Sequence, residues 1–301
     1  MRDQPGVVQS AMSIPPFTPC PVTGDAFIGR QGLVSNLRRR IAGGESLAVI
    51  GGPKLGKTSL VRTALQGLSD RTVIEVDCGT NPSPPLNGVS GSIVVLENLD
   101  VIYGPAIAPL LMRLSAAGTA GLVVTGGRRL RTLLGHSVTE TGLSFRLFPL
   151  SVLLDGETCR LIGRDTNPSL AAWTGNHPYV TKLLLHYLHY SEDSDHAVAA
   201  GRCQWEPFVR RLAADIGEGL ERRLLCYLIE RGKPVNPAEA QSDTGIQDIK
   251  AVADTLVYLG VVSRWIRNEE ATLFAGCRLL NNHITRSTIL TRRGGDNRAH
   301  V

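Results

Sequence analysis

One stretch of the sequence carries residue types spaced for phosphate chemistry. The segment SLAVIGGPKLGKTSL, Ser46 to Leu60, reads as a short apolar strand, a glycine-rich turn and the start of a helix. Within it Gly51, Gly56, Lys57 and Thr58 satisfy the pattern G-x-x-x-x-G-K-[ST]. Glycines let the backbone wrap phosphates with its N–H groups inward, and the new helix directs its positive dipole end at the same anion. The segment is therefore predicted to bind a nucleoside triphosphate.

Each polar side chain of this loop has an expected role. Lys57 can reach the β- and γ-phosphates, and the Thr58 hydroxyl can bind Mg²⁺. The residues predicted to surround the nucleotide here are Gly51, Gly52, Pro53, Lys54, Leu55, Gly56, Lys57, Thr58 and Ser59.

A second group of polar residues follows the apolar run of residues 93–96. A phosphate-binding loop needs an acid at the end of a neighbouring strand to hold Mg²⁺, and Glu97 is in that place. The usual pair at this position is Asp followed by Glu, whose carboxylate polarises the attacking water. Here Asn98 follows Glu97 and cannot act as a base. Hydrolysis is therefore predicted to be weak, with Asp100 as the alternative acid and Lys57 as the fourth catalytic candidate. Ordinary capping polar groups at a strand end are the alternative interpretation.

A third polar turn, Thr125-Gly126-Gly127-Arg128, ends the next apolar run. A polar residue in this place can distinguish a triphosphate from a diphosphate. Thr125 is the first candidate and Arg128 the second, although a solvent-exposed Arg128 is an equal alternative.

The elements that must position these residues follow from the apolar runs. Strands alternate with helices, which indicates an α/β layer with a parallel sheet. Ligands of such sheets bind at the carboxyl ends of the strands, where all three polar groups fall. The predicted strands cover residues 46–50, 72–78, 93–96, 122–124 and 145–150.

The rest of the chain reads as helical. Residues around Asp193 are expected to form a loop between helices. The last segment has the order helix, short helix, helix, hairpin, which is a winged-helix pattern. The predicted organisation is an extended arm over 1–24, a P-loop domain over 25–150, an all-α lid over 151–216, a winged-helix domain over 217–290 and a tail over 291–301.

Composition narrows the class of protein. The chain has 301 residues, of which 43% are hydrophobic and 20% charged, as in soluble globular proteins. It has no apolar run of roughly 20 residues and no signal-peptide pattern, so we expect a cytoplasmic protein without membrane contact. The six cysteines are scattered with no C-x-x-C pair, which argues against a zinc site or a disulfide framework. A net charge of +5 permits an anionic partner without requiring one.

Several short motifs occur together in a family-like order. Phe27-Ile28-Gly29-Arg30, the loop at Gly51, the strand ending in Glu97, Thr125-Gly126-Gly127 and residues 173–178 (WTGNHP) follow one another as in STAND-type signal-transduction ATPases. Over residues 15–290 the chain resembles the prokaryotic and archaeal branch of that family, which is related to AAA+ origin-initiator proteins.

The resemblance implies roles for residues outside the loop. It places Ile28, Gly29 and Arg30 near the adenine, and it places His177 and Pro178 in a lid that senses the nucleotide. A helix-opening His-Pro is also a plain helix N-terminus, which is the alternative for His177. The chain departs from the family at Asn98 and lacks its large C-terminal repeat array.

Taken with the loop, the resemblance implies a molecular switch that binds ATP or ADP with Mg²⁺, hydrolyses ATP slowly and engages a partner protein encoded elsewhere. It is also compatible with a homo-oligomer in the ATP-bound state. The alternative is an ATP-dependent DNA-binding protein of the initiator or transposition-helper type. Against DNA, the exposed positions of the third winged-helix helix include Asp248 and Asp254 beside Lys250. In the family this module packs on the ATPase core and holds the off state, which is the role we expect.

Overall fold

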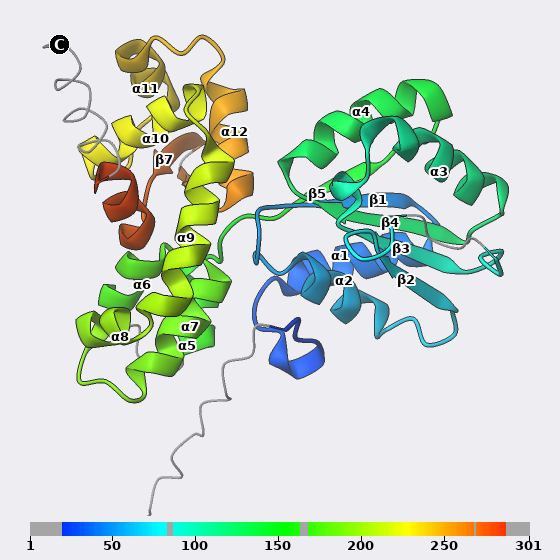
Figure 1. Ribbon diagram of the computed structural model, residues 1–301, viewed down its shortest axis with the longest axis horizontal. Helices are drawn as coiled ribbons and strands as arrows, with labels where there is room; N and C mark the ends of the chain where they lie inside the picture. The colour runs from blue at the N-terminus through cyan, green and yellow to red at the C-terminus, as the bar shows by residue number, and fades with distance from the viewer. Residues whose placement is uncertain (1–19, 83–86, 163–167, 268, 287–301) are drawn as a thin grey trace, which may run out of the picture.

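The structure is a computed structural model that describes residues 20–82, 87–162, 168–267 and 269–286. An α/β layer forms one half of the molecule, and a helical half stands beside it (Figure 1). The arm before residue 20 and the tail predicted over 291–301 lie outside the described residues.

The predicted parallel sheet is confirmed. Its five strands lie in the order β2-β3-β4-β1-β5, and every neighbouring pair runs parallel. The phosphate-binding strand β1 therefore lies inside the sheet, between β4 and β5. The strands are β1 (Ser46–Ile50), β2 (Val73–Asp77), β3 (Ile93–Glu97), β4 (Gly121–Gly126) and β5 (Arg146–Pro149).

Helices cover both faces of the sheet because side chains alternate along each strand. Leu47 and Val49 of β1 pack with α1 (Gln31–Ala42) and α2 (Lys57–Leu65). Ala48 and Ile50 belong to the core on the other face, under α3 (Gly104–Ala116). The helix α4 (Arg128–Thr141) and the short turns η1 (Gly24–Ala26) and η2 (Leu99–Val101) complete this half.

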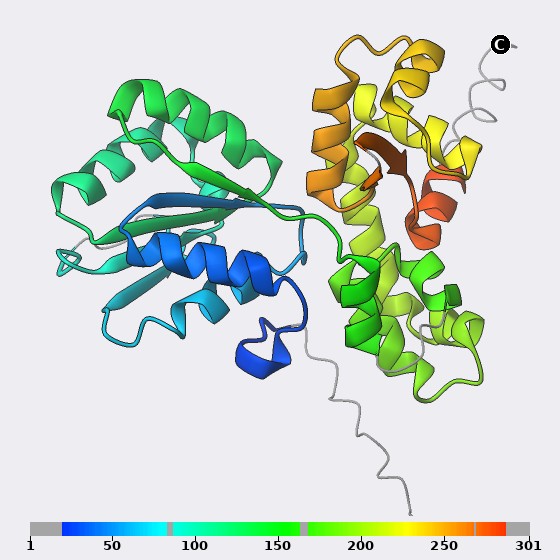
Figure 2. The ribbon, with the colours of Figure 1, turned by 180° about the vertical axis from the view of Figure 1, so that it is seen from behind.

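The chain leaves the sheet through β5 and enters the helical half, as the view from behind shows (Figure 2). One apolar core runs through this half and joins Leu184 and Val209 to Leu224 and Leu256. Its elements are α5 (Asp155–Ile162), α6 (Pro168–Thr174), α7 (Pro178–Leu188), α8 (Ser194–Ala200), α9 (Arg202–Ile216), α10 (Leu220–Arg231), α11 (Pro237–Thr244), α12 (Ile249–Leu259), the antiparallel pair β6 (Ser263–Arg267) and β7 (Glu270–Phe274), and a last helix from residue 278.

The loop predicted around Asp193 is present but short: residues 189–193 are non-helical and lead into a helix, α8, that the sequence did not indicate. Helix α8 begins at Ser194, and the Asp193 carboxylate accepts hydrogen bonds from the backbone N–H groups of Asp195 and His196, both at 2.9 Å. Asp193 is therefore the N-cap of α8 at the end of this short loop.

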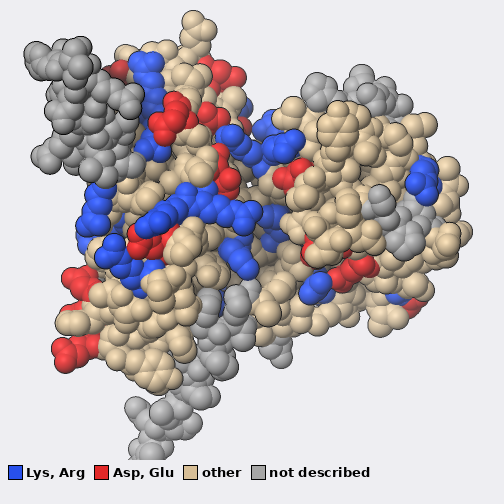
Figure 3. Space-filling view, in the orientation of Figure 1, with Lys and Arg blue, Asp and Glu red and all other residues tan. Residues whose placement is uncertain are grey.

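Two surface properties bear on function. Among the described residues no helix is long and apolar enough to cross a membrane. Lys and Arg side chains gather in a band across the helical half that reaches its junction with the α/β layer (Figure 3).

Candidate nucleotide-binding site

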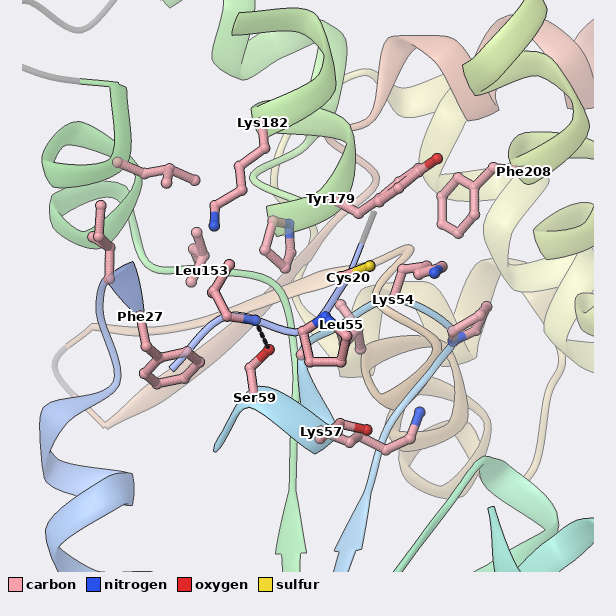
Figure 4. A pocket seen from close by; sticks show the side chains of 18 of the residues that line it. Cys20, Phe27, Lys54, Leu55, Lys57, Ser59, Leu153, Tyr179, Lys182 and Phe208 are labelled. Atoms are coloured by element: carbon pink, nitrogen blue, oxygen red, sulfur yellow. Dashed lines mark hydrogen bonds between the residues drawn. The ribbon is translucent and has the colours of Figure 1, made fainter. Parts of the chain in front are cut away.

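A cavity of about 600 Å³ opens at the carboxyl ends of the strands, where the sheet meets the helical half (Figure 4). Its floor is the phosphate-binding loop, and α7 and α9 form its other side. The volume is within the range of small-molecule sites. Among the sequence-predicted site residues it is lined by Ile28, Arg30, Pro53, Lys54, Leu55, Gly56, Lys57, Thr58, Ser59, Asn98 and Pro178.

Lys57 lies at the start of α2 and folds back over the loop. Its Nζ donates hydrogen bonds to the carbonyls of Gly51 and Gly52, both at 2.9 Å. Burial lowers the pKa of Lys57 to about 8, against the opposing charges of Asp100 and Glu97. A buried ammonium bound only to neutral carbonyls would gain strongly from an anionic phosphate.

Thr58 and Glu97 form the pair expected at a Mg²⁺ site. The Thr58 hydroxyl donates to Glu97 Oε2 at 3.2 Å. The other carboxylate oxygen, Oε1, is buried without a hydrogen-bond partner, and its contact with Arg62 is at 3.9 Å. Burial raises the pKa of Glu97, while Arg62 opposes the shift. An unpaired buried carboxylate oxygen beside a hydroxyl fits a hydrated Mg²⁺, so the residues present suit this ion.

Asn98 lies at the mouth of the cavity with φ of 56°. Its side-chain amide donates to Asp77 Oδ1 at 2.9 Å, and its backbone N–H donates to the Thr125 hydroxyl at 3.2 Å. Thr125 is buried and does not line the cavity. Its position links the ends of β3 and β4.

Asp100 and Arg128 are occupied by other contacts. Asp100 Oδ2 accepts the backbone N–H of Gly127 at 2.9 Å. Arg128 is exposed, does not line the cavity and pairs with Glu221 of α10 at 3.7 Å. The structure thus brings Arg128 to the helical half rather than to the loop.

Arg30 ties the loop to the helical half. Its guanidinium donates to the carbonyls of Leu55 at 2.5 Å and Ser151 at 2.6 Å, and its backbone N–H donates to the Glu157 carboxylate. Burial lowers the pKa of Arg30 to about 10, while Glu157 opposes the shift. Gly29 has φ of 84°, which strains other residue types, and a Cβ there would lie in a tight contact 3.1 Å from Glu157.

His177 precedes α7 and is 2% exposed. Its ring lies edge-on to Phe208 with centroids 5.0 Å apart, and neither ring nitrogen has a hydrogen-bond partner. Burial, followed by the charge of Arg30, lowers the pKa of His177 to about 3, although the backbone of Pro53 acts in the opposite direction. His177 is therefore a neutral packing residue between the helical half and the loop.

This burial predicts a pH dependence of stability. The unfolded chain takes up a proton on His177 as the pH falls through about 6.5, whereas the folded chain does so only near about 3. The stabilisation is full at a pH above the pKa of His177 in the unfolded chain, and it is lost as the pH falls toward the pKa in the folded chain. Lowering the pH from 7 to 5 should cost about 2 kcal/mol of unfolding free energy at this residue. Urea unfolding at pH 7 and pH 5 measures this loss. The unfolding free energy of His177→Leu should fall by correspondingly less between the two pH values, whereas that of His189→Gln, at an exposed site, should fall as much as in wild type. Equal losses in all three proteins would contradict this account.

The sequence did not indicate the helical side of the cavity. Gln204, Phe208 and Arg211 of α9 line it, as do Tyr179 and Lys182 of α7. The α9 residues share one helical face, but only tertiary packing sets that face against the loop. Tyr179 and Lys182 are at positions that could have been noticed, because they follow Pro178 within the first two turns of its helix.

The end of α12 also reaches the phosphate-binding loop. The backbone N–H of Gly52 donates to the carbonyl of Tyr258 at 2.6 Å. A Cβ at Gly52 would lie 2.4 Å from the Leu259 carbonyl oxygen, and one at Gly260 would lie 2.8 Å from Leu55 Cδ2. Gly52 thus permits a backbone-to-backbone approach that a side chain would block, and Gly260 leaves room for the Leu55 side chain.

Metal binding by side chains alone is not indicated, since the described ranges hold no group of three or more His, Cys, Asp or Glu able to surround an ion. Mg²⁺ here would depend on nucleotide phosphates for its remaining ligands.

We compared the sequence and the structure with known proteins. No protein-family model and no curated protein matches the sequence. The Walker-type ATPase PABY2304 of Pyrococcus abyssi has a similar structure, with a TM-score of 0.58 at 12% identity over 89% of this chain and 99% of that one. The Thermotoga maritima RuvB Holliday junction branch migration motor gives 0.45 at 14% identity, over 88% of this chain and 97% of that one. The first similarity, together with the strand order and the loop, shows that the chain has the P-loop NTPase fold.

Proposed function

We propose that this chain is an ATP-binding switch with slow hydrolysis, in which Mg²⁺-ATP occupies the cavity. The observation that carries the proposal is the placement of Lys57 and Thr58 in the lining of the cavity, with the Thr58 hydroxyl hydrogen-bonded to Glu97 at the end of β3 behind that lining. Lys57 would bind the β- and γ-phosphates, and Thr58 with Glu97 would hold the metal. The apolar wall that includes Phe27, Ile28 and other residues of the cavity would receive the adenine.

We expect slow hydrolysis because of the residues that follow β3. Asn98 has no basic group, and Asp100 is bonded to Gly127 rather than directed at the cavity. A switch needs slow turnover because the bound triphosphate must persist long enough to be recognised.

Coupling to the rest of the molecule would pass through one residue, Gly52. The Gly52 carbonyl accepts from Lys57, while the Gly52 N–H donates to Tyr258 at the end of α12. A phosphate that draws the ammonium of Lys57 away from Gly52 removes one of these two contacts. The nucleotide would therefore favour a different arrangement of α12. A partner protein would recognise that arrangement, and ATP-bound copies of the chain could associate through it.

Gly260→Ala tests this coupling. A methyl group at Gly260 would meet Leu55, so we expect α12 to leave the loop and bound nucleotide to exchange several-fold faster. Fluorescent ADP analogue release, followed by stopped flow, measures the effect.

Gly245→Ala is the matched control. Gly245 also ends a helix, α11, with φ of 64°, against 75° for Gly260, so both variants carry similar backbone strain. A Cβ at Gly245 meets nothing closer than 4.0 Å. Equal exchange rates in the two variants would contradict the coupling.

DNA recognition by α12 is not favoured. Most of its apolar residues are buried in the core, its last turn contacts Gly52, and Asp254 pairs with Arg264 at 2.6 Å. A helix held in this way does not present a basic face to a DNA groove.

A further inference from the structure

A basic face crosses the helical half and reaches its junction with the α/β layer (Figure 3), and two of its residues line the cavity. We define this basic face by five cationic residues, of which four are exposed and Arg222 is half-buried. They are Arg202, Arg210 and Arg211 of α9, Arg222 of α10, and Lys54 of the phosphate-binding loop.

The charge of the basic face is only partly balanced. Glu206 is shared between Arg202 at 2.8 Å and Arg210 at 2.6 Å. Arg222 pairs with Glu218 at 3.3 Å. His283 lies between α9 and α10, and after burial the charges of Arg210 and Arg222 lower its pKa, against Glu206. One carboxylate thus serves two arginines, and the three arginines of α9 exceed its two acids, Glu206 and Asp215, so α9 keeps a positive charge.

Aromatic rings lie where the basic face meets the cavity. The rings of Tyr179 and Phe208 are 5.1 Å apart, and the Lys54 ammonium is 5.7 Å from the Tyr179 ring centroid. Arg211 lines the same cavity. The described residues of its lining include no carboxylate.

We propose that the basic face binds single-stranded nucleic acid, with phosphates along the α9 arginines and a base against Tyr179 and Phe208. Spaced arginines match a phosphate backbone, and aromatic rings beside them stack on unpaired bases. A duplex keeps its bases stacked inside and would not use the rings. An acidic peptide would use the arginines but gains nothing specific from the ring pair. This inference goes beyond nucleotide switching and uses a different surface from α12. Tyr179 and Phe208 line the helical side of the cavity, so the base would lie there, across from the phosphate-binding loop.

The test uses the full chain and a fluorescently labelled single-stranded oligonucleotide of about 20 nucleotides, with anisotropy measured at several salt concentrations. A triple variant, Arg202→Gln with Arg210→Gln and Arg222→Gln, should bind roughly tenfold more weakly or worse and show a smaller salt dependence. The control carries the same number of exchanges on the α/β layer, Arg39→Gln with Arg71→Gln and Arg113→Gln, at exposed positions. It should bind like wild type.

A second variant, Tyr179→Leu, tests the stacking. It should weaken single-strand binding by about tenfold while leaving the salt dependence unchanged. Tighter binding of a duplex of equal length, equal binding of polyglutamate, or equal affinity of the triple variant and its control would overturn the proposal. ATP affinity of the same triple variant, measured by calorimetry, should match wild type. A wild-type chain that does not bind ATP would instead refute the nucleotide switch. Failure of the single-strand proposal and failure of the switch are therefore distinguishable.

Discussion

Lys57→Ala is expected to abolish ATP binding, with a loss of affinity of at least about a hundredfold. Two charge-assisted hydrogen bonds to phosphate contribute roughly 1.5–3 kcal/mol each, and the site is shielded from water. The folded variant should be no less stable than wild type, since burial depresses the pKa of Lys57 and so disfavours its charged form. Isothermal calorimetry gives the affinity, and thermal unfolding gives the stability.

Lys54→Ala is the control for this prediction. Lys54 lies three residues earlier in the same loop, but its side chain is exposed and lies over the Tyr179 ring. Its removal should weaken ATP binding far less than the removal of Lys57. If Lys57→Ala bound ATP within tenfold of wild type, the loop would not be the phosphate site.

Asn98→Glu is expected to raise ATP turnover by about a hundredfold or more, since a positioned general base contributes roughly 10²–10⁴ in rate. The new carboxylate would lie near Asp77, whose Oδ1 is 2.9 Å from the present amide nitrogen. Repulsion between the two carboxylates would raise the pKa of the new group and improve it as a base. Steady-state phosphate release measures the gain.

The neutral exchange Asn98→Gln separates charge from size. It keeps an amide of similar length to glutamate and should leave turnover at the wild-type level. If Asn98→Glu binds ATP but turns it over no faster than Asn98→Gln, then Asn98 is not at the position of the attacking water.

The sequence predicted the parts of this protein that local patterns decide. The loop from Gly51 to Ser59 and the strands around it carry their own glycine spacing and apolar runs, so the sheet and the placement of Lys57, Thr58 and Glu97 followed directly. The N-terminus of α7 at Pro178 was also predicted from the sequence, because proline favours the first turn of a helix.

Tertiary packing decided the rest. Nothing local shows that Tyr258 would meet Gly52, or that Arg128 would pair with Glu221. Thr125 was predicted beside the phosphates because it ends a strand, yet its hydroxyl binds the backbone of Asn98 instead. Helix α8 was missed because its capping carboxylate, Asp193, stands in a polar run that also fits a loop.

Hydrogen exchange at the end of α12 tests the central claim most directly. In the structure Tyr258 accepts from Gly52, and Gly52 accepts from Lys57. The γ-phosphate of ATP adds to the pull of the β-phosphate on the Lys57 ammonium, so ATP should loosen this contact more than ADP does. Amide exchange over residues 249–262, measured by mass spectrometry, should increase with Mg²⁺ and a non-hydrolysable ATP analogue relative to ADP. Identical exchange with the two nucleotides, both bound at saturation, would contradict a switch that operates through α12.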